Sequence, residues 1–229
     1  MVEDEYTAHD VVDWTGYLFH TEVDALQDWA RSLPADPVVV NIGAGNGTSG
    51  LAFLQARDDL FLWTIEKQRE SSPFGCLEGE WAVLEKAGLW PCRRYGYLHG
   101  DSAAEGRNWK EGSIDLVFVD ADHSYAGCKA DIEAWLPHIK PGGLLIVHDY
   151  KKDERFAQPI TGRAPHPKAW HGVDQAVDEL LVGSYEIVGR VDTAIAFRVP
   201  DEAATKWEKK RVRRAVGKRV KPEAETDDV

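Results

Sequence analysis

The sequence predicts one α/β domain, built on a mostly parallel sheet of seven strands with helices on both faces. Three observations support this fold class. The chain of 229 residues is long enough for one such domain with a substantial core, and too short for two. Continuous apolar runs, typical of buried parallel strands, alternate with segments of helical periodicity. One run, residues 38–42, stops at a cluster of glycines, which is typical of a ligand-binding turn.

Composition argues against nucleic acids and membranes as partners. Acidic residues outnumber basic ones by 39 to 27, and the formal net charge is −12. Such a charge opposes general attraction to anionic polymers or lipids. No apolar run approaches the roughly 18 residues that span a bilayer. The three cysteines show no C-x-x-C spacing and no secretory signal precedes them. We therefore expect a cytoplasmic protein with a small-molecule substrate, and we leave a homo-oligomer open.

The N-terminal residues divide into an arm and a helix. Residues 1–10 are polar and acidic, and we expect a flexible arm. Between residues 11 and 31 apolar side chains recur at helical spacing, and Thr21 is suited to cap a helix that ends near Ser32. We expect this helix to lie against the sheet.

The glycine cluster follows the first predicted strand. Gly43, Gly45 and Gly47 can adopt positive φ and let the backbone approach a ligand. Thr48 or Ser49 then suits the start of a helix whose amide groups face the turn. A literal G-x-G-x-x-G begins only at Gly45, two residues past the strand end. Counted from that end, the third glycine is missing, so the motif leaves a nucleotide-type site and a purely structural turn open.

The second and third strands also end in acids. Residues 60–65 are followed by Glu66, about twenty residues past the glycine turn, where an acid can bind both hydroxyls of a ribose. The alternative is a solvated strand-end acid. A helix over 76–87 and a strand over 95–99 follow. That strand ends at Gly100, Asp101 and Ser102, which either border an adenine or cap the next short helix.

The fourth and fifth strands end in acid and histidine. Residues 114–119 run into Asp120, with His123 three residues on, and residues 144–147 run into His148 and Asp149. A helix between them carries an apolar face. Its members are Ile132, Trp135, Leu136 and Ile139. Since parallel strands end at one edge of a sheet, we expect the acids and histidines to lie together.

The C-terminal part contains a loop, a hairpin and a tail. Residues 151–172 are rich in proline and lack apolar periodicity, so we interpret them as a lid or substrate loop within a domain of residues 11–200. A helix from residue 173 and two strands over 185–190 and 194–199 close the sheet as an antiparallel edge. Residues 201–229 form a charged tail, either a solvated helix with a disordered end or a contact for an acidic partner.

In this order, the segments resemble class I S-adenosylmethionine-dependent methyltransferases over roughly residues 12–199. The resemblance is carried by residues 41–49, Glu66, residues 100–102 and the terminal hairpin. More narrowly, residues 119–125 and 142–150 resemble the small-molecule O-methyltransferase branch of macrocin and cephalosporin-type enzymes. This resemblance implies a Rossmann-like sheet in the order 3-2-1-4-5-7-6 with strand 7 antiparallel.

The resemblance also implies site residues. The methyl donor, S-adenosylmethionine, would lie across the ends of strands 1 to 3. Its implied contacts are Asn41, Gly43, Ala44, Gly45, Asn46, Thr48, Ser49, Glu66, Gly100, Asp101, Ser102 and Asp120. A divalent cation, Mg²⁺ or Mn²⁺, would bind Asp120, His148 and Asp149. Because His148 stands where the branch often has a second acid, either the metal preference shifts or the imidazole points elsewhere. His123 matches the proposed general base, or else supports Asp120 as a cap or partner.

The function expected from these implications is metal-assisted O-methylation of a hydroxylated small molecule. A nicotinamide dinucleotide oxidoreductase is the enzymatic alternative, which the missing third glycine and the short chain disfavour. A non-catalytic nucleoside-binding protein with the same fold is the other alternative, since fold does not establish chemistry.

Overall fold

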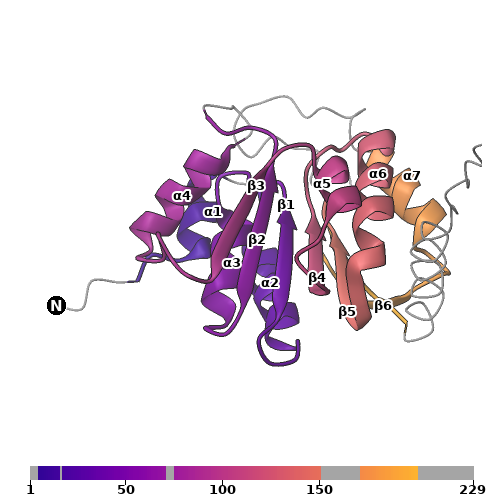
Figure 1. The fold of residues 1–229 in the computed structure, drawn as a ribbon, viewed down its shortest axis with the longest axis horizontal. Coiled ribbons are helices and arrows are strands. Elements are labelled where there is room, and N and C mark those ends of the chain that lie inside the picture. The colour runs from indigo at the N-terminus through magenta and orange to yellow at the C-terminus, as the bar shows by residue number, and fades with distance from the viewer. Residues whose placement is uncertain (1–4, 16, 71–74, 151–170, 201–229) are drawn as a thin grey trace, which may run out of the picture.

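A computed structural model of the chain describes residues 5–15, 17–70, 75–150 and 171–200. Its sheet has the strand order β3-β2-β1-β4-β5-β7-β6, and β7 runs antiparallel to both of its neighbours (Figure 1). The strands are β1 (Val38–Ile42), β2 (Phe61–Glu66), β3 (Tyr95–His99), β4 (Ile114–Val119), β5 (Ile139–Val147), β6 (Glu186–Val191) and β7 (Ala194–Arg198). The expected order and the antiparallel edge are confirmed.

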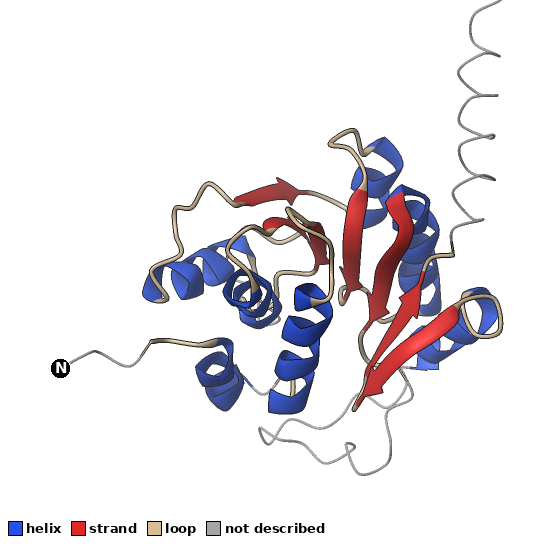
Figure 2. Cartoon of the chain, turned by 90° about the horizontal axis from the view of Figure 1, so that it is seen from below, coloured by secondary structure: helices blue, strands red, loops and turns tan. Residues whose placement is uncertain are grey.

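Two groups of helices enclose the sheet (Figure 2). One face packs against α1 (Ala8–Thr15), α2 (His20–Arg31), α3 (Thr48–Ala56) and α4 (Leu77–Lys86). The other packs against α5 (Ser102–Asn108), α6 (Tyr125–Trp135) and α7 (His171–Leu180). Successive strand residues alternate between the two cores, so that Val39 faces the first group and Val40 the second. Both faces are therefore apolar, which explains the continuous apolar runs in the sequence.

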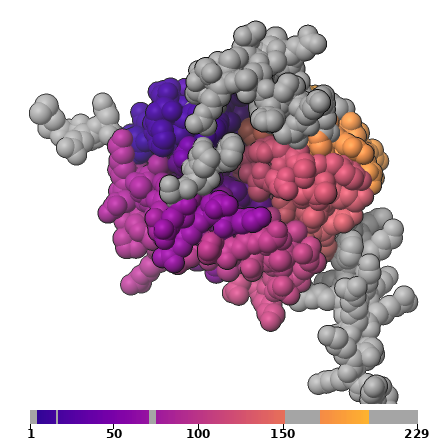
Figure 3. Space-filling view, turned by 90° about the horizontal axis from the view of Figure 1, so that it is seen from above, coloured from indigo at the N-terminus to yellow at the C-terminus, as the bar shows by residue number. Residues whose placement is uncertain are grey.

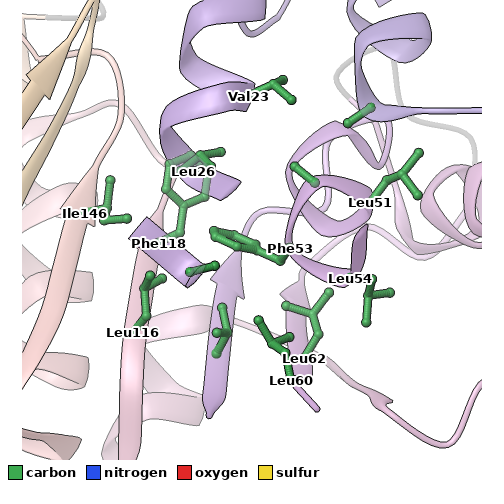
Figure 4. Close-up of a cluster of buried hydrophobic side chains, with 14 of the residues drawn as sticks. Val23, Leu26, Leu51, Phe53, Leu54, Leu60, Leu62, Leu116, Phe118 and Ile146 are labelled. Carbon is green, nitrogen blue, oxygen red and sulfur yellow. The ribbon is translucent and has the colours of Figure 1, made fainter. Parts of the chain in front are cut away.

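Aromatic packing fixes α3 on the sheet. Phe53 of α3 meets Phe118 of β4 edge to face, with ring centroids 6.0 Å apart, and Leu26 of α2 lies beside Phe118 (Figure 4). All three side chains are fully buried, and each such burial contributes about 1.5–3 kcal/mol. The start of α3, and with it the glycine turn, is thereby held against the ends of β1 and β4.

The N-terminal region differs from the prediction. Helix α1 begins at Ala8, inside the range expected to be a flexible arm, and Asp10 accepts hydrogen bonds from the N–H and hydroxyl of Thr7 at its start. The helix expected to end near Ser32 is α2, and α1 precedes it as a separate helix. The polar and acidic composition of residues 1–10 suggested an arm, yet Ala8 is buried in the core.

The start of α2 also corrects a prediction. The helix begins after Phe19, whose backbone N–H donates to Glu22 Oε2 at 2.9 Å. A glutamate three residues into a helix satisfies the otherwise unpaired N–H before it. Thr21 therefore is not the cap, and its hydroxyl instead bonds to Asp192.

The segment after α6 is the third difference. We expected Ile139 on a helical face, but α6 ends at Trp135, a short 3₁₀ helix (η1) spans Leu136–His138, and Ile139 begins β5. Pro137 lacks a backbone N–H and cannot continue the helix. Ile139 nevertheless shares one core with Ile132 and Trp135, so the predicted burial was right and the predicted element was wrong.

The expected lid and tail lie outside the described residues. Of residues 151–172, only His171 and Gly172 are described, as the start of α7. Among the described residues, no helix combines the length and the apolar character that crossing a bilayer requires.

Candidate functional site

The glycine turn between β1 and α3 has the conformation that its sequence predicts. Gly43, Gly45 and Gly47 have φ values of 95°, 51° and 88°, which side chains with a Cβ rarely adopt. A Cβ at Gly43 would lie 2.1 Å from the carbonyl oxygen of Asp120. Beside Gly45, by contrast, no described atom lies within 4 Å of a Cβ position. The turn is thus packed against β4 on one side and open on the other, as a backbone cradle for a ligand requires.

Glu66 lies at the end of β2 beside this turn. Its Oε2 accepts a hydrogen bond from the N–H of Ala44 at 2.9 Å, and its Oε1 accepts one from the N–H of Gln68 at 2.7 Å. Each carboxylate oxygen has a second lone pair for a further donor. Glu66 therefore holds the turn in place and keeps the capacity to accept bonds from a ligand hydroxyl.

Three of the residues predicted to contact the methyl donor have buried side chains. Asn41, Thr48 and Ser49 are buried, and the Ser49 hydroxyl donates to Asn41 Oδ1 at 3.1 Å. Asn41 follows Val39 on the sheet face that α3 covers, so its side chain points beneath the turn. Ligand contacts from Thr48 and Ser49 would have to use the backbone N–H groups at the start of α3. Asn46, next to Gly45, is half-buried at the open side.

Asp101 and Ser102 are engaged in local structure. Asp101 Oδ1 accepts a hydrogen bond from the N–H of Ala104 at 2.9 Å and caps α5. The Ser102 hydroxyl bonds to the carboxylate of Asp131. Asp101 thus has the capping role that the sequence allowed, and its contact with an adenine stays a prediction. Asp101 is exposed and Gly100 is half-buried, and both follow β3 at the edge where the parallel strands end.

Acids and a histidine meet where β4 and β5 end, as expected. His123 Nε2 lies 2.8 Å from Asp149 Oδ2 and 3.5 Å from Asp120 Oδ1. One ligand atom from each of these three residues lies within 4.8 Å of the others. Asp149 has φ of 62°, a conformation that costs of order 1 kcal/mol in a residue with a side chain and is common at functional sites. Carboxylate oxygens with one imidazole nitrogen suit Mn²⁺ and, less closely, Mg²⁺.

The His148 ring lies between this group and Glu22 of α2. Its Nε2 lies 3.1 Å from Glu22 Oε2, and its Nδ1 lies 3.1 Å from Asp120 Oδ1. Both ring nitrogens thus face carboxylates, which favours the doubly protonated imidazolium. Burial lowers the pKa of His148, but the charges of Asp120, Asp149 and Glu22 outweigh it and raise the pKa well above its ordinary value. Among the described residues, the group that could hold a cation contains His123, whereas the resemblance implied His148 with the same two aspartates, and the metal set stays a prediction.

Glu22 and Thr193 are residues that the sequence analysis missed. Glu22 is fully buried, and its Oε1 accepts hydrogen bonds from the N–H and the hydroxyl of Thr193 at 2.9 and 2.8 Å. The pair joins α2 to the turn between β6 and β7. An acid on the buried face of a predicted helix was the available signal, since Val23 and Leu26 share that face. The separation of 171 residues between the partners hides the contact from any local pattern.

The charges of this cluster determine its protonation. Burial lowers the pKa of His123, but its hydrogen bonds to Asp120 and Asp149 outweigh that effect and raise the pKa to about 10. Burial would likewise raise the pKa of Asp120, yet His148 and His123 hold it well below the ordinary value. Without a cation, both imidazoles therefore carry protons at neutral pH. A metal ion at the carboxylates would compete with the His123 proton.

Figure 3 shows the molecule from the side where these strands end. The surface of the N-terminal helices, in indigo, meets that of the residues after β4, in salmon. Inside the molecule, His148 links Glu22 of α2 to Asp120, which follows β4.

A protein-family model described as a methyltransferase domain matches residues 40–150, just under half of the chain. The match contains the glycine turn, Glu66, Asp120, His123 and Asp149, while Glu22 and Thr193 lie outside it. Among curated proteins, the uncharacterized protein y4gI of Sinorhizobium fredii is 40% identical over 40 residues, which are 18% of this chain and 4% of that protein. The chain thus matches only a small part of that relative.

Solved structures share the fold across most of the chain. An O-methyltransferase from Bacillus cereus, in complex with SAH, has 18% identity and a TM-score of 0.62, covering 87% of this chain and 93% of its own. TomG, an O-methyltransferase from Streptomyces achromogenes in complex with SAM, has 21% identity and a TM-score of 0.60, covering 85% of this chain and 87% of its own. A putative caffeoyl-CoA O-methyltransferase from Staphylococcus aureus has 16% identity and a TM-score of 0.61, covering 84% of this chain and 90% of its own.

Proposed function

We propose that this protein transfers the methyl group of S-adenosylmethionine to a hydroxyl oxygen of a small molecule, because residues 40–150 match a methyltransferase-domain model and most of the chain shares the fold of solved O-methyltransferases. One observation carries the proposal. The glycine turn and the acid-histidine cluster adjoin, because the Asp120 backbone packs against Gly43 while the Asp120 side chain belongs to the cluster. This adjacency supports a donor cradle at the turn with a proton-transfer group beside it.

The donor end of the site uses backbone and Glu66. The open side of Gly45 and the first N–H groups of α3 are suited to the carboxylate of the amino-acid part of the donor. Glu66 would accept hydrogen bonds from the ribose hydroxyls through its remaining lone pairs. Positioning by such contacts supplies much of the rate enhancement in a bimolecular transfer.

Asp120 and Asp149 would hold a divalent cation in this proposal. When bound there, the cation would lower the pKa of a coordinated hydroxyl group. His148 takes no part as a ligand, because Glu22 and Asp120 occupy its nitrogens. It serves instead as a fixed positive partner that orients the Asp120 carboxylate.

His123 would accept the proton of the acceptor hydroxyl. The charges of Asp120 and Asp149 now keep it protonated, and a neutral imidazole is needed for a base. Partial neutralisation of the two carboxylates by a cation would favour that neutral form. The proton then moves to Nε2, which the Asp149 carboxylate stabilises from 2.8 Å.

Calorimetry with S-adenosylhomocysteine tests the first part of the proposal. Binding at micromolar concentration is expected, and no heat at millimolar ligand would reject a donor site. Transfer of a labelled methyl group to a panel of catechols, sugars and phenols, with Mn²⁺ or with EDTA, tests the second part. Bound donor with no transfer under any condition would favour the non-catalytic alternative.

A further inference from the structure

The three glycines of the literal G-x-G-x-x-G all contact α4 or the residue that precedes it. The carbonyl oxygen of Gly45 accepts a hydrogen bond from the N–H of Cys76 at 3.0 Å. A Cβ at Gly47 would lie 3.0 Å from Glu80 Cα, and a Cβ at Gly50 would lie 2.0 Å from Glu80 Oε1. The close approach of α4 therefore explains the glycines at positions 47 and 50 of the literal motif.

Glu80 is the polar centre of this contact. It is fully buried, its Oε2 accepts from the Tyr95 hydroxyl at 2.6 Å, and its Oε1 accepts from the Thr64 hydroxyl at 3.1 Å. The Asn41 side chain on β1 and the Glu66 carboxylate at the end of β2 also affect the pKa of Glu80. Among the described residues, Glu80 makes no ion pair. β1, β2, β3 and α3 thus surround the group, and none of them contributes a cation to it.

The Glu80 carboxyl lies under the first turn of α3. Gly47 caps this helix, and Gly50 is its third residue. A helix N-terminus carries a partial positive charge of about half a unit, which favours anions. An ionised Glu80 carboxylate, on the protein side of this turn, would interact with part of that positive charge. A neutral Glu80 would leave the charge available to an anionic ligand on the open side.

We propose that Glu80 is a positioning residue of the methyl-donor site, and that ionisation of its carboxyl weakens binding of the donor's own carboxylate at the start of α3. This inference rests on the proposed function, because it requires the donor to bind at the glycine turn. Burial raises the pKa of Glu80 to about 7, against the hydrogen bonds from Tyr95 and Thr64 that lower it, and the Glu66 charge raises it further. The carboxyl of Glu80 thus changes its charge within a pH range that binding experiments can cover.

Calorimetry of S-adenosylhomocysteine at pH 5.5 to 8.5, in EDTA, tests the proposal. The wild-type Kd is expected to rise about three-fold to ten-fold across this range. This is the effect on binding expected from one charge near a helix end. Glu80→Gln, which keeps the shape and stays neutral, is expected to retain the low-pH affinity throughout. Glu85→Gln, on the exposed side of α4, should follow the wild type. Adenosine, which lacks the amino-acid part, should show no such dependence in either protein.

Tyr95→Phe provides a second readout if Glu80→Gln does not fold. Loss of the hydroxyl donor should move the midpoint of the pH dependence upward, because that hydrogen bond favours the ionised acid. A pH-independent wild-type Kd, or the same dependence in Glu80→Gln as in the wild type, would overturn the role of Glu80. Failure of the wild type to bind at any pH would instead reject the proposed function.

Discussion

His148 Nε2 lies 3.1 Å from Glu22 Oε2, although 126 positions separate the two residues in the chain. Both side chains are buried, with exposed fractions of 4% and 0%. Through this pair, a helix outside the matched family domain reaches the carboxylate of Asp120. The pair therefore connects the stability of the N-terminal helices to the geometry of the candidate site.

Glu22→Ala should destabilise the fold by about 3–5 kcal/mol, because it leaves a buried imidazolium without its partner. Urea denaturation at pH 7 measures the change. Asp28→Ala, an exposed acid on the same helix with a surface ion pair to Arg31, should cost no more than about 1 kcal/mol. An equal decrease in the free energy of unfolding in the two variants would show that the buried pair stabilises the fold no more than a surface ion pair does.

Asp149→Asn should weaken Mn²⁺ binding at least ten-fold, because it removes one of two anionic ligands. Electron paramagnetic resonance of free Mn²⁺ measures the affinity without any turnover. Asp122→Asn is the matched control, since Asp122 is an exposed acid that accepts a bond from the N–H of Ser124 and lies outside the cluster. A wild-type protein that binds no Mn²⁺ would contradict the metal site.

His123→Ala should lower kcat by about 10²–10⁴-fold if the imidazole accepts the acceptor proton. Affinity for S-adenosylhomocysteine and for Mn²⁺ should then stay within about two-fold of the wild type. A large loss of Mn²⁺ affinity would instead make His123 the third metal ligand, as its place beside Asp120 and Asp149 also allows. Undiminished turnover would exclude both roles.

Glu80→Gln should change how stability depends on pH. The folded-state pKa of Glu80 is raised from 4.5 to about 7, so its favourable contribution is complete below pH 4.5 and disappears as pH rises through 7. Relative to Glu80→Gln, the wild type should therefore lose roughly 3 kcal/mol between pH 4 and pH 8.5. Denaturation curves at both pH values test this, and a constant difference between the two proteins would contradict it.

Gly50→Ala should destabilise the wild type by about 1–3 kcal/mol, because its Cβ would lie 2.0 Å from Glu80 Oε1. In a Glu80→Ala background, the same substitution should be nearly neutral or stabilising, because the obstruction is gone and alanine favours a helix. A double-mutant cycle measures the coupling. Additive effects would mean that Gly50 is required for some other reason.

The sequence by itself determined the sheet and the placement of its chemistry. Apolar runs followed by glycine or acid located β1, β2, β3 and β4 to within a residue, because burial on both faces leaves a continuous signal in the chain. Since parallel strands end at one edge, we also expected the acids and histidines after β4 and β5 to lie together, as Asp120, His123, His148 and Asp149 do. Helix bounds near Phe19 and Pro137 were less accurate, because single caps and breakers decide them.

Only the tertiary structure decided which partner each side chain has. The resemblance implied His148 as a metal ligand or as a side chain that points elsewhere, and only the structure shows its ring between the carboxylates of Glu22 and Asp120. Gly50 looked like a displaced dinucleotide-motif glycine, and the carboxyl of Glu80 explains it. Such contacts join residues far apart in the chain, and their energies depend on burial and distance, which no local pattern of residues records.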